Sequence, residues 1–219
     1  GIASRARLIS QVRQEEEQVL LLDAGDIFQG TPYFNIYKGE PEIKAMTLLG
    51  YDACTIGNHD FDAGMENLAT QLTKHARFPM LVCNYDFSST PMENKTEPYR
   101  VIRKGKLTIG LLGVGIEGKG LIPDNLFGNT RYLDPVQKAN ETAEFLKKSK
   151  KCDMVICLSH LGNQYKETDK PSDEILAKES ENIDLIIGGH THTFLDQPQV
   201  YKNKNGSDVV VNQVGFAGL

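Results

Sequence analysis

The sequence contains no tryptophan, and no apolar run in it comes near the roughly 20 residues that a transmembrane helix needs. We therefore expect no membrane span. It also lacks an excess of positive charge, because it contains 24 Lys and Arg residues and 29 Asp and Glu residues, which gives a net charge of −5. Surfaces that follow a nucleic-acid backbone are normally basic, so a nucleic-acid polymer is disfavoured as a partner. A small anionic substrate is compatible with this charge, since bound metal ions set the local field.

The four cysteines show no Cys-x-x-Cys spacing, and all lie in or beside apolar segments. Buried small side chains are the simpler interpretation, and the redox compartment stays open. With 219 residues the chain can bury one sizeable core, whereas two domains would each be small, so we expect a single domain over residues 1–219. The chain opens on Gly1 without a methionine and ends at Leu219 just after a strand-like run. We expect a chain that is trimmed or only partly observed at both ends.

Short apolar runs alternate with amphipathic helical patterns, which is the rhythm of βαβ units and predicts an α/β fold. Proline near the start and glycine past the end predict a helix from Glu40 to Gly50, and Asp134 before Pro135 predicts another that starts there. Further helices are expected over residues 4–17 and from Gly64. Hairpins are expected over 99–114 and 200–211, and a strand over 80–83. Four more runs typical of buried parallel strands cover residues 19–23, 53–56, 154–159 and 185–188.

Two other segments need separate interpretation. Residues 113–119 read Gly-Val-Gly-Ile-Glu-Gly-Lys, which matches a dinucleotide-binding glycine pattern and, as far as its lysine, a P-loop. Gly120 stands where a P-loop requires Ser or Thr, and Pro123 follows where a phosphate-binding helix is needed, so we expect a flexible loop near the sheet edge. The long loop over about residues 84–98 is expected to be solvated rather than substrate-facing.

Four of the five histidines lie in short polar stretches, each placed where an apolar run ends. In open α/β sheets, ligands bind beyond the carboxyl ends of the parallel strands, so these stretches are expected to converge on one site although they are far apart in the chain. The stretches are Gly25-Asp26, Gly57-Asn58-His59-Asp60 with Asp62, Ser159-His160, and Gly188-Gly189-His190-Thr191-His192.

Taken alone, each candidate has an ordinary structural explanation. Asp26 and Asn58 are residue types that form turns, and His160 could be a satisfied core histidine. His190 and His192 are two apart, so on extended backbone their side chains would fall on the same side and serve two neighbouring ions, but a lone His-x-His is weak. The shared strand-end placement favours a metal site. Imidazole nitrogen with carboxylate and amide oxygen suits zinc, manganese, iron or cobalt better than calcium or an iron–sulfur cluster.

These linked motifs resemble the calcineurin-like metallophosphoesterases, and in particular their 5′-nucleotidase branch. The resemblance covers nearly the whole chain and rests on residues 22–26 with 29–31, 51–53, 57–62 and 188–192. It implies a four-layer α/β/β/α sandwich of two mixed sheets flanked by helices. It also implies hydrolysis of nucleoside 5′-monophosphates, and sometimes of cyclic nucleotides or nucleotide sugars, usually in the periplasm or outside the cell.

The resemblance also implies roles for individual residues. Asp26 would bridge two divalent ions; Asn58, His160 and His190 would complete one site, and His192 would help to hold the other. His59 would be the catalytic histidine, and Asp62 would orient it.

Elementary chemistry accounts for such a centre. Two ions lower the pKa of a bound water, align the resulting hydroxide with phosphorus and neutralise phosphoryl charge, so no covalent intermediate is required. His59 adjoins Asn58 and can stabilise charge or protonate the leaving oxygen. Asp62 can fix the tautomer of His59, although it could instead cap the helix near Gly64. Asp60 is expected to support the loop rather than the reaction.

The sequence departs from the family pattern at both ends. The family begins with a strand that ends in Asp-x-His and supplies two ligands of the first metal, and this chain starts after that position. The long nucleotidases also carry a C-terminal nucleotide-binding domain, which would here be missing or separate. We therefore expect one metal site to be incomplete, because it keeps only Asp26 and His192, and at most one ion to bind tightly.

Two competing functions remain open. A phosphodiesterase acting on cyclic nucleotides or nucleotide sugars would share every ligand, and a comparison of monoester with diester hydrolysis would separate it from a nucleotidase. A non-catalytic metal-dependent binding protein would hold phosphate compounds without turnover.

Overall fold

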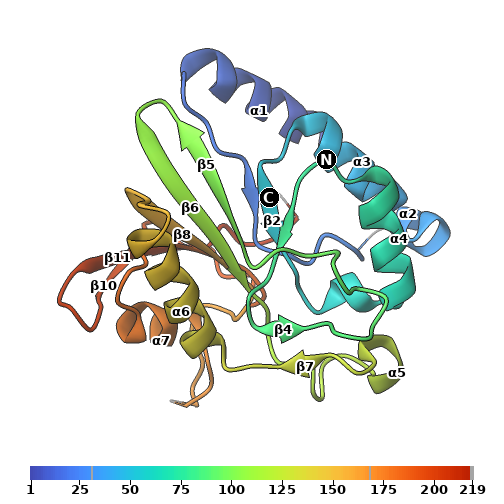
Figure 1. The fold of residues 1–219 in the computed structure, drawn as a ribbon. Coiled ribbons are helices and arrows are strands. Elements are labelled where there is room, and N and C mark those ends of the chain that lie inside the picture. Colours follow the sequence, from blue (N-terminus) through green and yellow to red (C-terminus); the bar gives the residue numbers. More distant parts are fainter. Residues whose placement is uncertain (31, 168, 218–219) are drawn as a thin grey trace.

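The computed structural model describes residues 1–30, 32–167 and 169–217. Thr31, which belongs to the motif over residues 29–31, and the last two residues lie outside this description. The fold contains two β-sheets and a separate two-stranded ribbon, with helices on both sides (Figure 1). The chain begins with the expected helix, α1 (Ile2–Glu15), whose bounds lie two residues before the predicted 4–17, and this helix lies at the periphery of the molecule.

The smaller sheet has three strands in the order β1 (Leu22–Asp23), β2 (Ala53–Thr55) and β3 (Met80–Leu81), all parallel. The larger sheet has six strands, in the spatial order β10 (Gln199–Lys202), β11 (Asp208–Asn212), β9 (Leu185–Gly188), β8 (Met154–Ser159), β6 (Leu107–Val114) and β5 (Tyr99–Lys104). Its four inner strands are parallel, whereas β5 and β10 pair antiparallel at the edges. Mixed pairing is therefore a property of the larger sheet.

The two sheets pack face to face through a buried layer of aliphatic side chains. Ala53 and Leu81 of the smaller sheet meet Leu111, Ile156 and Leu158 of the larger one, and all five are buried. The apolar runs of β2, β6 and β8 follow from this, because a strand covered on both faces needs apolar side chains on both. Gly113 marks the closest approach, since a Cβ there would lie 2.1 Å from the carbonyl oxygen of Leu81.

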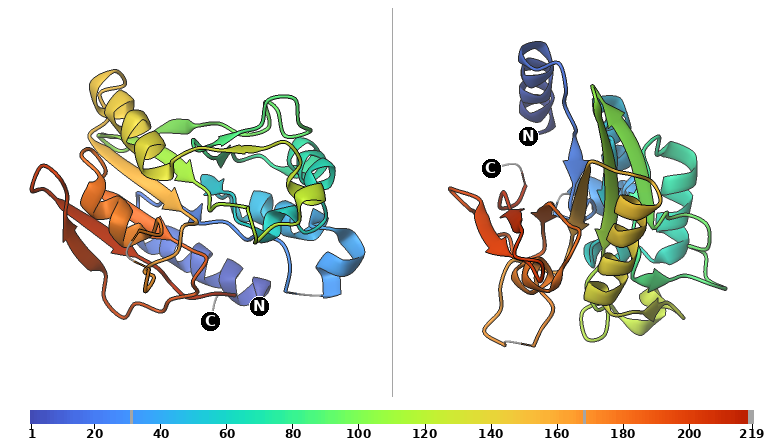
Figure 2. Two further views of the ribbon diagram at one scale, coloured as in Figure 1. Left: turned by 90° about the horizontal axis from the view of Figure 1, so that it is seen from below. Right: turned by 60° about the vertical axis from the view of Figure 1, so that its left-hand side comes forward.

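Helices cover the outer face of each sheet, which completes the four layers (Figures 1 and 2). The helices α3 (Glu40–Leu49) and α4 (Met65–His75) contribute to the core on the outer side of the smaller sheet. The helices α6 (Pro135–Lys148) and α7 (Asp173–Glu179) do the same for the larger sheet. The predicted α/β/β/α sandwich is confirmed.

Local sequence signals explain where the main helices begin and end. Pro41 lies in the first turn of α3, and Gly50 ends the helix with a left-handed φ of 69°. The side chain of Asp134 accepts a hydrogen bond from the backbone N–H of Gln137 at 2.8 Å and so caps α6. The described residues also form three further short helical elements: α2 (Pro32–Tyr37), η1 (His59–Phe61) and α5 (Asp124–Phe127).

The segment over residues 84–98 is more ordered than expected for a solvated loop. It contains β4 (Tyr85–Asp86), which pairs antiparallel with β7 (Arg131–Tyr132). Tyr85, Phe87 and Met92 are buried in the core beneath α4. The prediction was wrong for these residues, because their side chains pack against distant elements, which loop length alone does not reveal. Residues 88–89 and 93–95 are exposed, as expected of a solvated loop.

The glycine-rich segment after β6 is also packed rather than flexible. Gly115 lies against the ring of Tyr85, where a Cβ would come within 2.5 Å of the ring carbon, and Ile116 is buried. The strand β6 is internal to its sheet, so the segment does not lie at a sheet edge. Its glycines serve close packing, in agreement with the rejection of a phosphate-binding loop.

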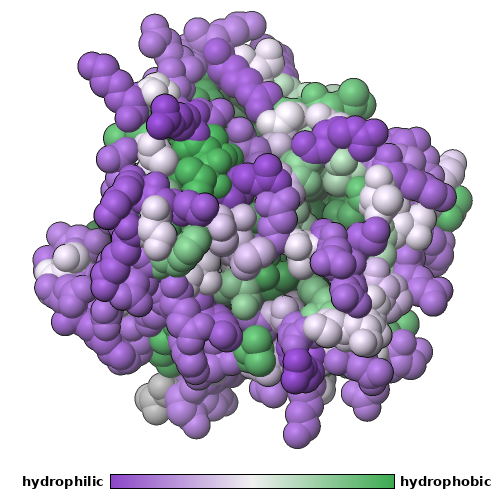
Figure 3. Space-filling view, viewed as in Figure 1, coloured by the Kyte–Doolittle hydropathy of each residue, from purple (hydrophilic) through white to green (hydrophobic). Residues whose placement is uncertain are grey.

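The surface shown in Figure 3 is mostly hydrophilic, and its apolar side chains lie in small scattered patches. Within the described residues, no helix has the length and apolar character needed to cross a bilayer.

Candidate metal centre

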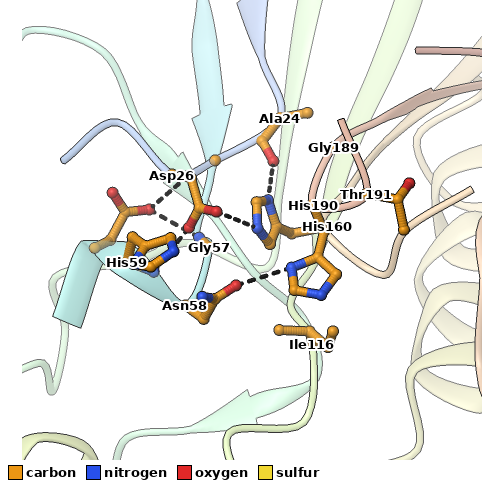
Figure 4. Close-up of polar contacts among 12 residues, drawn as sticks. Ala24, Asp26, Gly57, Asn58, His59, Ile116, His160, Gly189, His190 and Thr191 are labelled. Carbon is orange, nitrogen blue, oxygen red and sulfur yellow. Dashed lines mark hydrogen bonds and ion pairs between the residues drawn. The ribbon is translucent and has the colours of Figure 1, made fainter. Parts of the chain in front are cut away.

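The predicted polar stretches meet at one edge of the two sheets. Asp26 follows β1, Asn58 follows β2, His160 follows β8 and His190 follows β9. The parallel strands of each sheet end at the same edge, so side chains from four separate parts of the chain point toward one another there (Figure 4). The convergence that the sequence predicts is therefore present.

Asp26 and His160 form the buried centre of the cluster. The His160 side chain is 1% exposed, and its Nε2 lies 2.9 Å from Oδ2 of Asp26. Its Nδ1 donates to the carbonyl oxygen of Ala24 at 2.6 Å. Burial alone would raise the pKa of Asp26 and lower that of His160, but their mutual attraction outweighs it, so the pKa of Asp26 is lowered and that of His160 is raised.

His190 and Asn58 flank this pair. Nδ1 of His190 lies 2.9 Å from Oδ1 of Asn58, and the imidazole packs edge-to-face on His160 with ring centroids 5.2 Å apart. Ile116 lies beside His190 in Figure 4. Burial, together with the nearby His160, lowers the pKa of His190 to about 4. The imidazole is therefore neutral at neutral pH, which is the form that binds metal ions.

The donor set fits a divalent cation. One ligand atom from each of Asp26, His160 and His190 lies within 4.8 Å of the other two. Because Nδ1 of His160 donates its proton to a backbone carbonyl, Nε2 is the ring nitrogen that faces the cluster, 2.9 Å from Oδ2 of Asp26. A divalent cation would take the place of the proton that holds these two atoms together. Two imidazoles, a carboxylate and the nearby carboxamide of Asn58 suit zinc, manganese, iron or cobalt.

Asp60 holds the first two loops together. Its carboxylate is buried and accepts backbone N–H groups from Gly57 and Ile27 at 2.8 Å, from Asp26 at 3.1 Å and from Phe28 at 3.2 Å. Burial and the neighbouring Asp26 carboxylate raise the pKa of Asp60 to about 7. Gly57 allows the loops to come close, since a Cβ there would lie 2.2 Å from Oδ1 of Asp26. The structure gives Asp60 the contacts expected of a residue that supports the loop.

His59 lies at the solvent side of the cluster. Its backbone N–H donates to Oδ1 of Asp26 at 2.8 Å, but its side chain is 44% exposed and is not among the clustered ligands. Nδ1 of His59 lies 2.9 Å from Oδ2 of Asp62, and Gln29 donates to the same carboxylate oxygen. Asp62 does not cap α4, whose N-cap is Gly64. The contact expected between His59 and Asp62 is present, and their catalytic roles stay a prediction.

His192 lies apart from the buried pair. Its side chain is exposed, and its ring stacks on Phe216 with centroids 4.9 Å apart. The expectation of extended backbone was wrong, because His190 and His192 have left-handed φ angles of 69° and 54°. The loop turns back between Gly189 and Thr191, whose N–H donates to the Gly189 carbonyl oxygen at 2.9 Å. A role for His192 in holding a second ion stays a prediction.

The profile of the family described as calcineurin-like phosphoesterase matches residues 1–194. The chain belongs to this family. It is 35% identical over 198 residues to a snake venom 5′-nucleotidase of Crotalus adamanteus, which covers 89% of this chain and 32% of the relative. The chain therefore spans about a third of the length of that curated relative.

Solved structures agree with the sequence comparison. A 5′-nucleotidase precursor from Thermus thermophilus superposes with a TM-score of 0.86 at 34% identity, over 97% of this chain and 43% of that one. An NAD nucleotidase from Haemophilus influenzae superposes with a TM-score of 0.84 at 25% identity, over the same shares of the two chains. The predicted calcineurin-like phosphoesterase family, the similarity to 5′-nucleotidases and the fold are confirmed.

Proposed function

We propose that residues 1–219 form a single catalytic domain that releases phosphate from nucleoside 5′-monophosphates in a metal-dependent reaction. The convergence of Asp26, His160 and His190 with Asn58 carries this proposal, because it brings together a buried or half-buried ligand set that suits a divalent cation. Similarity to 5′-nucleotidases over most of the chain supports the substrate class.

The geometry of the cluster supports the proposed ligands of the first ion, and the family resemblance supports those of the second. Asp26, Asn58, His160 and His190 would hold one ion, and a second ion would share Asp26 and use His192. When bound, such ions supply Lewis acidity that activates water and neutralises charge on the phosphoryl oxygens. The second ion has fewer ligands from this chain, so we expect it to bind more weakly.

His59 is placed to act on the substrate rather than on the ions. Its backbone N–H is tied to Asp26, which keeps the imidazole beside the cluster, while the exposed ring is free of the ligand set. Asp62 accepts from Nδ1, so Nε2 is the nitrogen that can exchange a proton with the leaving oxygen or stabilise charge there. Asp62 thereby holds the tautomer that this role requires.

A nucleotide phosphodiester is the second candidate substrate class. The NAD nucleotidase from Haemophilus influenzae shares the fold over 97% of this chain. A cluster of this kind neutralises phosphoryl charge in monoesters and diesters alike, so both substrate types must be tested.

We also propose that the protein acts in the periplasm or outside the cell. The support is the similarity to a nucleotidase from snake venom. A small-molecule nucleotide is the proposed partner, and a C-terminal nucleotide-binding domain, in the same chain or separate, is a further proposed component.

The deciding experiment measures phosphate release from AMP and, by chromatography, the nucleotide products formed from a cyclic nucleotide, a nucleotide sugar and NAD, together with metal content. We expect turnover of AMP that disappears when metal is removed and returns with zinc, manganese, iron or cobalt. Hydrolysis of the diesters alone would replace the monoesterase proposal. Metal binding and nucleotide binding without any turnover would identify the non-catalytic alternative.

A further inference from the structure

The loop that carries His190 and His192 has an unfavourable backbone. Both histidines have left-handed φ angles, 69° and 54°, which residues with a Cβ rarely adopt. Such conformations persist only where surrounding contacts over-determine them. A specific set of contacts must therefore hold this loop in the shape that brings His190 to Asp26 and Asn58.

One buried side chain from another strand supplies those contacts. Gln213 follows β11, the neighbour of β9 in the sheet, and is 1% exposed. Its Nε2 donates to the carbonyl oxygen of Gly189 at 2.6 Å, and its Oε1 accepts from the backbone N–H of Thr193 at 2.5 Å. These two bonds reach both sides of the loop, one before His190 and one after His192.

The same carboxamide also connects the two histidine-bearing loops. The Thr191 hydroxyl donates to Oε1 of Gln213 at 3.0 Å. That hydroxyl oxygen in turn accepts the backbone N–H of Asn163, which lies in the loop after His160, at 2.9 Å. A chain of hydrogen bonds thus runs from Gln213 through Thr191 to the segment that follows His160.

We infer that Gln213 is a positioning residue of the metal centre, which fixes the loop carrying His190 without touching the ion. This inference rests on the proposed metal-dependent function. The carboxamide is the group that the site requires, because it must donate to one backbone group and accept from another. A carboxylate would face the Gly189 carbonyl with a second acceptor, and an apolar side chain would leave the Thr193 N–H without its partner.

The test compares Gln213→Met with a matched control, Asn203→Leu. Asn203 is also buried, and its side chain accepts from the backbone N–H of Asn205 at 3.0 Å and of Ser207 at 2.9 Å in the turn between β10 and β11. Both changes remove a buried carboxamide that clamps a loop next to β11, and only one of those loops carries His190. The control reports the effect of lost stability alone.

Affinity for Co²⁺ and Zn²⁺ is measured by titration of the metal-stripped full chain. Gln213→Met should weaken the tighter ion by about 10–100-fold, whereas Asn203→Leu should change it less than about twofold. In Gln213→Met, kcat should largely return at saturating metal, because the catalytic groups themselves are intact. Equal affinity in Gln213→Met and the unchanged protein, or equal loss in the control, would overturn the inference.

A second variant covers the case in which Gln213→Met does not fold. Thr191→Val removes only the hydroxyl that links Gln213 to Asn163, and it should weaken the same ion by a smaller factor of about 3–10. Unchanged affinity in that variant would count against the network. If the unchanged protein binds no metal, the proposed function fails instead. If it binds metal and releases phosphate while both variants match it, only the role of Gln213 is refuted.

Discussion

The two halves of the metal centre are held by different kinds of buried group. In the half after β1 and β2, four backbone N–H groups converge on the Asp60 carboxylate. In the half after β9, Gln213 meets a carbonyl oxygen on one side and an N–H on the other. The converging donors favour an ionised carboxylate and oppose the burial that raises the pKa of Asp60, whereas a neutral carboxamide suits a place where donors and acceptors alternate. The choice of anchor therefore follows from the polarity of the loop backbone.

The largest effect is expected when the pair formed by Asp26, in the first half, and His160, which follows β8, is broken. Asp26→Asn removes the charge that pairs with His160 across the site, so metal occupancy and turnover should both fall, with kcat/KM reduced about 10⁴-fold. Metal analysis and AMP hydrolysis measure the two losses. Retained metal stoichiometry in this variant would show that Asp26 does not bridge two ions.

His59→Asn separates the role of the His59 ring from that of the metal ligands in the first half. The change leaves the backbone N–H bonded to Asp26 and alters only the exposed side chain. We expect kcat to fall by about 10²–10⁴-fold, while metal content stays nearly intact. Steady-state kinetics and metal analysis check this result. Loss of metal in this variant would place His59 among the ligands.

The two anchors can be compared directly by unfolding. Asp60→Ala leaves four N–H groups without their acceptor, so we expect it to lower the free energy of unfolding by about 3 kcal/mol. Gln213→Met removes fewer and uncharged bonds and should cost about 1–2 kcal/mol. Urea unfolding of the metal-free variants gives both values. An equal or reversed order would show that the number of converging donors does not set the strength of the anchor.

The last expected effect is a gradual change of stability with pH, and it concerns a buried carboxylate behind the second half. Asp173 begins α7 and is fully buried, and burial, opposed by the Ser159 hydroxyl, raises its pKa to about 7. Between pH 4 and 7 the folded protein then binds more protons at this group than the unfolded chain, so its contribution to stability is present at low pH and is lost as pH rises toward about 7.

Asp173→Asn should remove this dependence. The free energies of unfolding of the variant and the unchanged protein should diverge by up to about 1.4 kcal/mol per pH unit over this range, as measured by urea unfolding at several pH values. Asp196→Asn, at an exposed carboxylate, is the matched control. Parallel stability profiles of Asp173→Asn and the unchanged protein would contradict the raised pKa.

Much of the fold could be predicted because its signals are local. The strands over 154–159 and 185–188 have the predicted bounds, since each is a continuous apolar run covered on both faces. The helix α6 starts where Asp134 and Pro135 predict it. By contrast, β1 is limited to Leu22–Asp23 and β3 to Met80–Leu81, because pairing with a neighbour, and not hydrophobicity, decides how far a strand extends.

Of the two anchors of the site, Asp60 was expected from the sequence to support its loop, whereas Gln213 was not predicted. Gln213 carries no motif and follows His190 by a full hairpin, so nothing in its own sequence context connects it to that loop. The role of Gln29 beside Asp62 is hidden for the same reason. Such residues are defined by contacts between segments that are remote in the chain.

The sequence by itself determined which residues lie at the strand ends, and hence that Asp26, Asn58, His160 and His190 would meet, because parallel strands bring their carboxyl ends to a common edge. Only the tertiary structure decided how these side chains are held. The left-handed backbone at His190 and His192, the four amides on Asp60 and the carboxamide of Gln213 each require partners from other loops. Backbone hydrogen-bonding groups that are buried away from water must find such partners, and the partners become available only once the sheets have packed together.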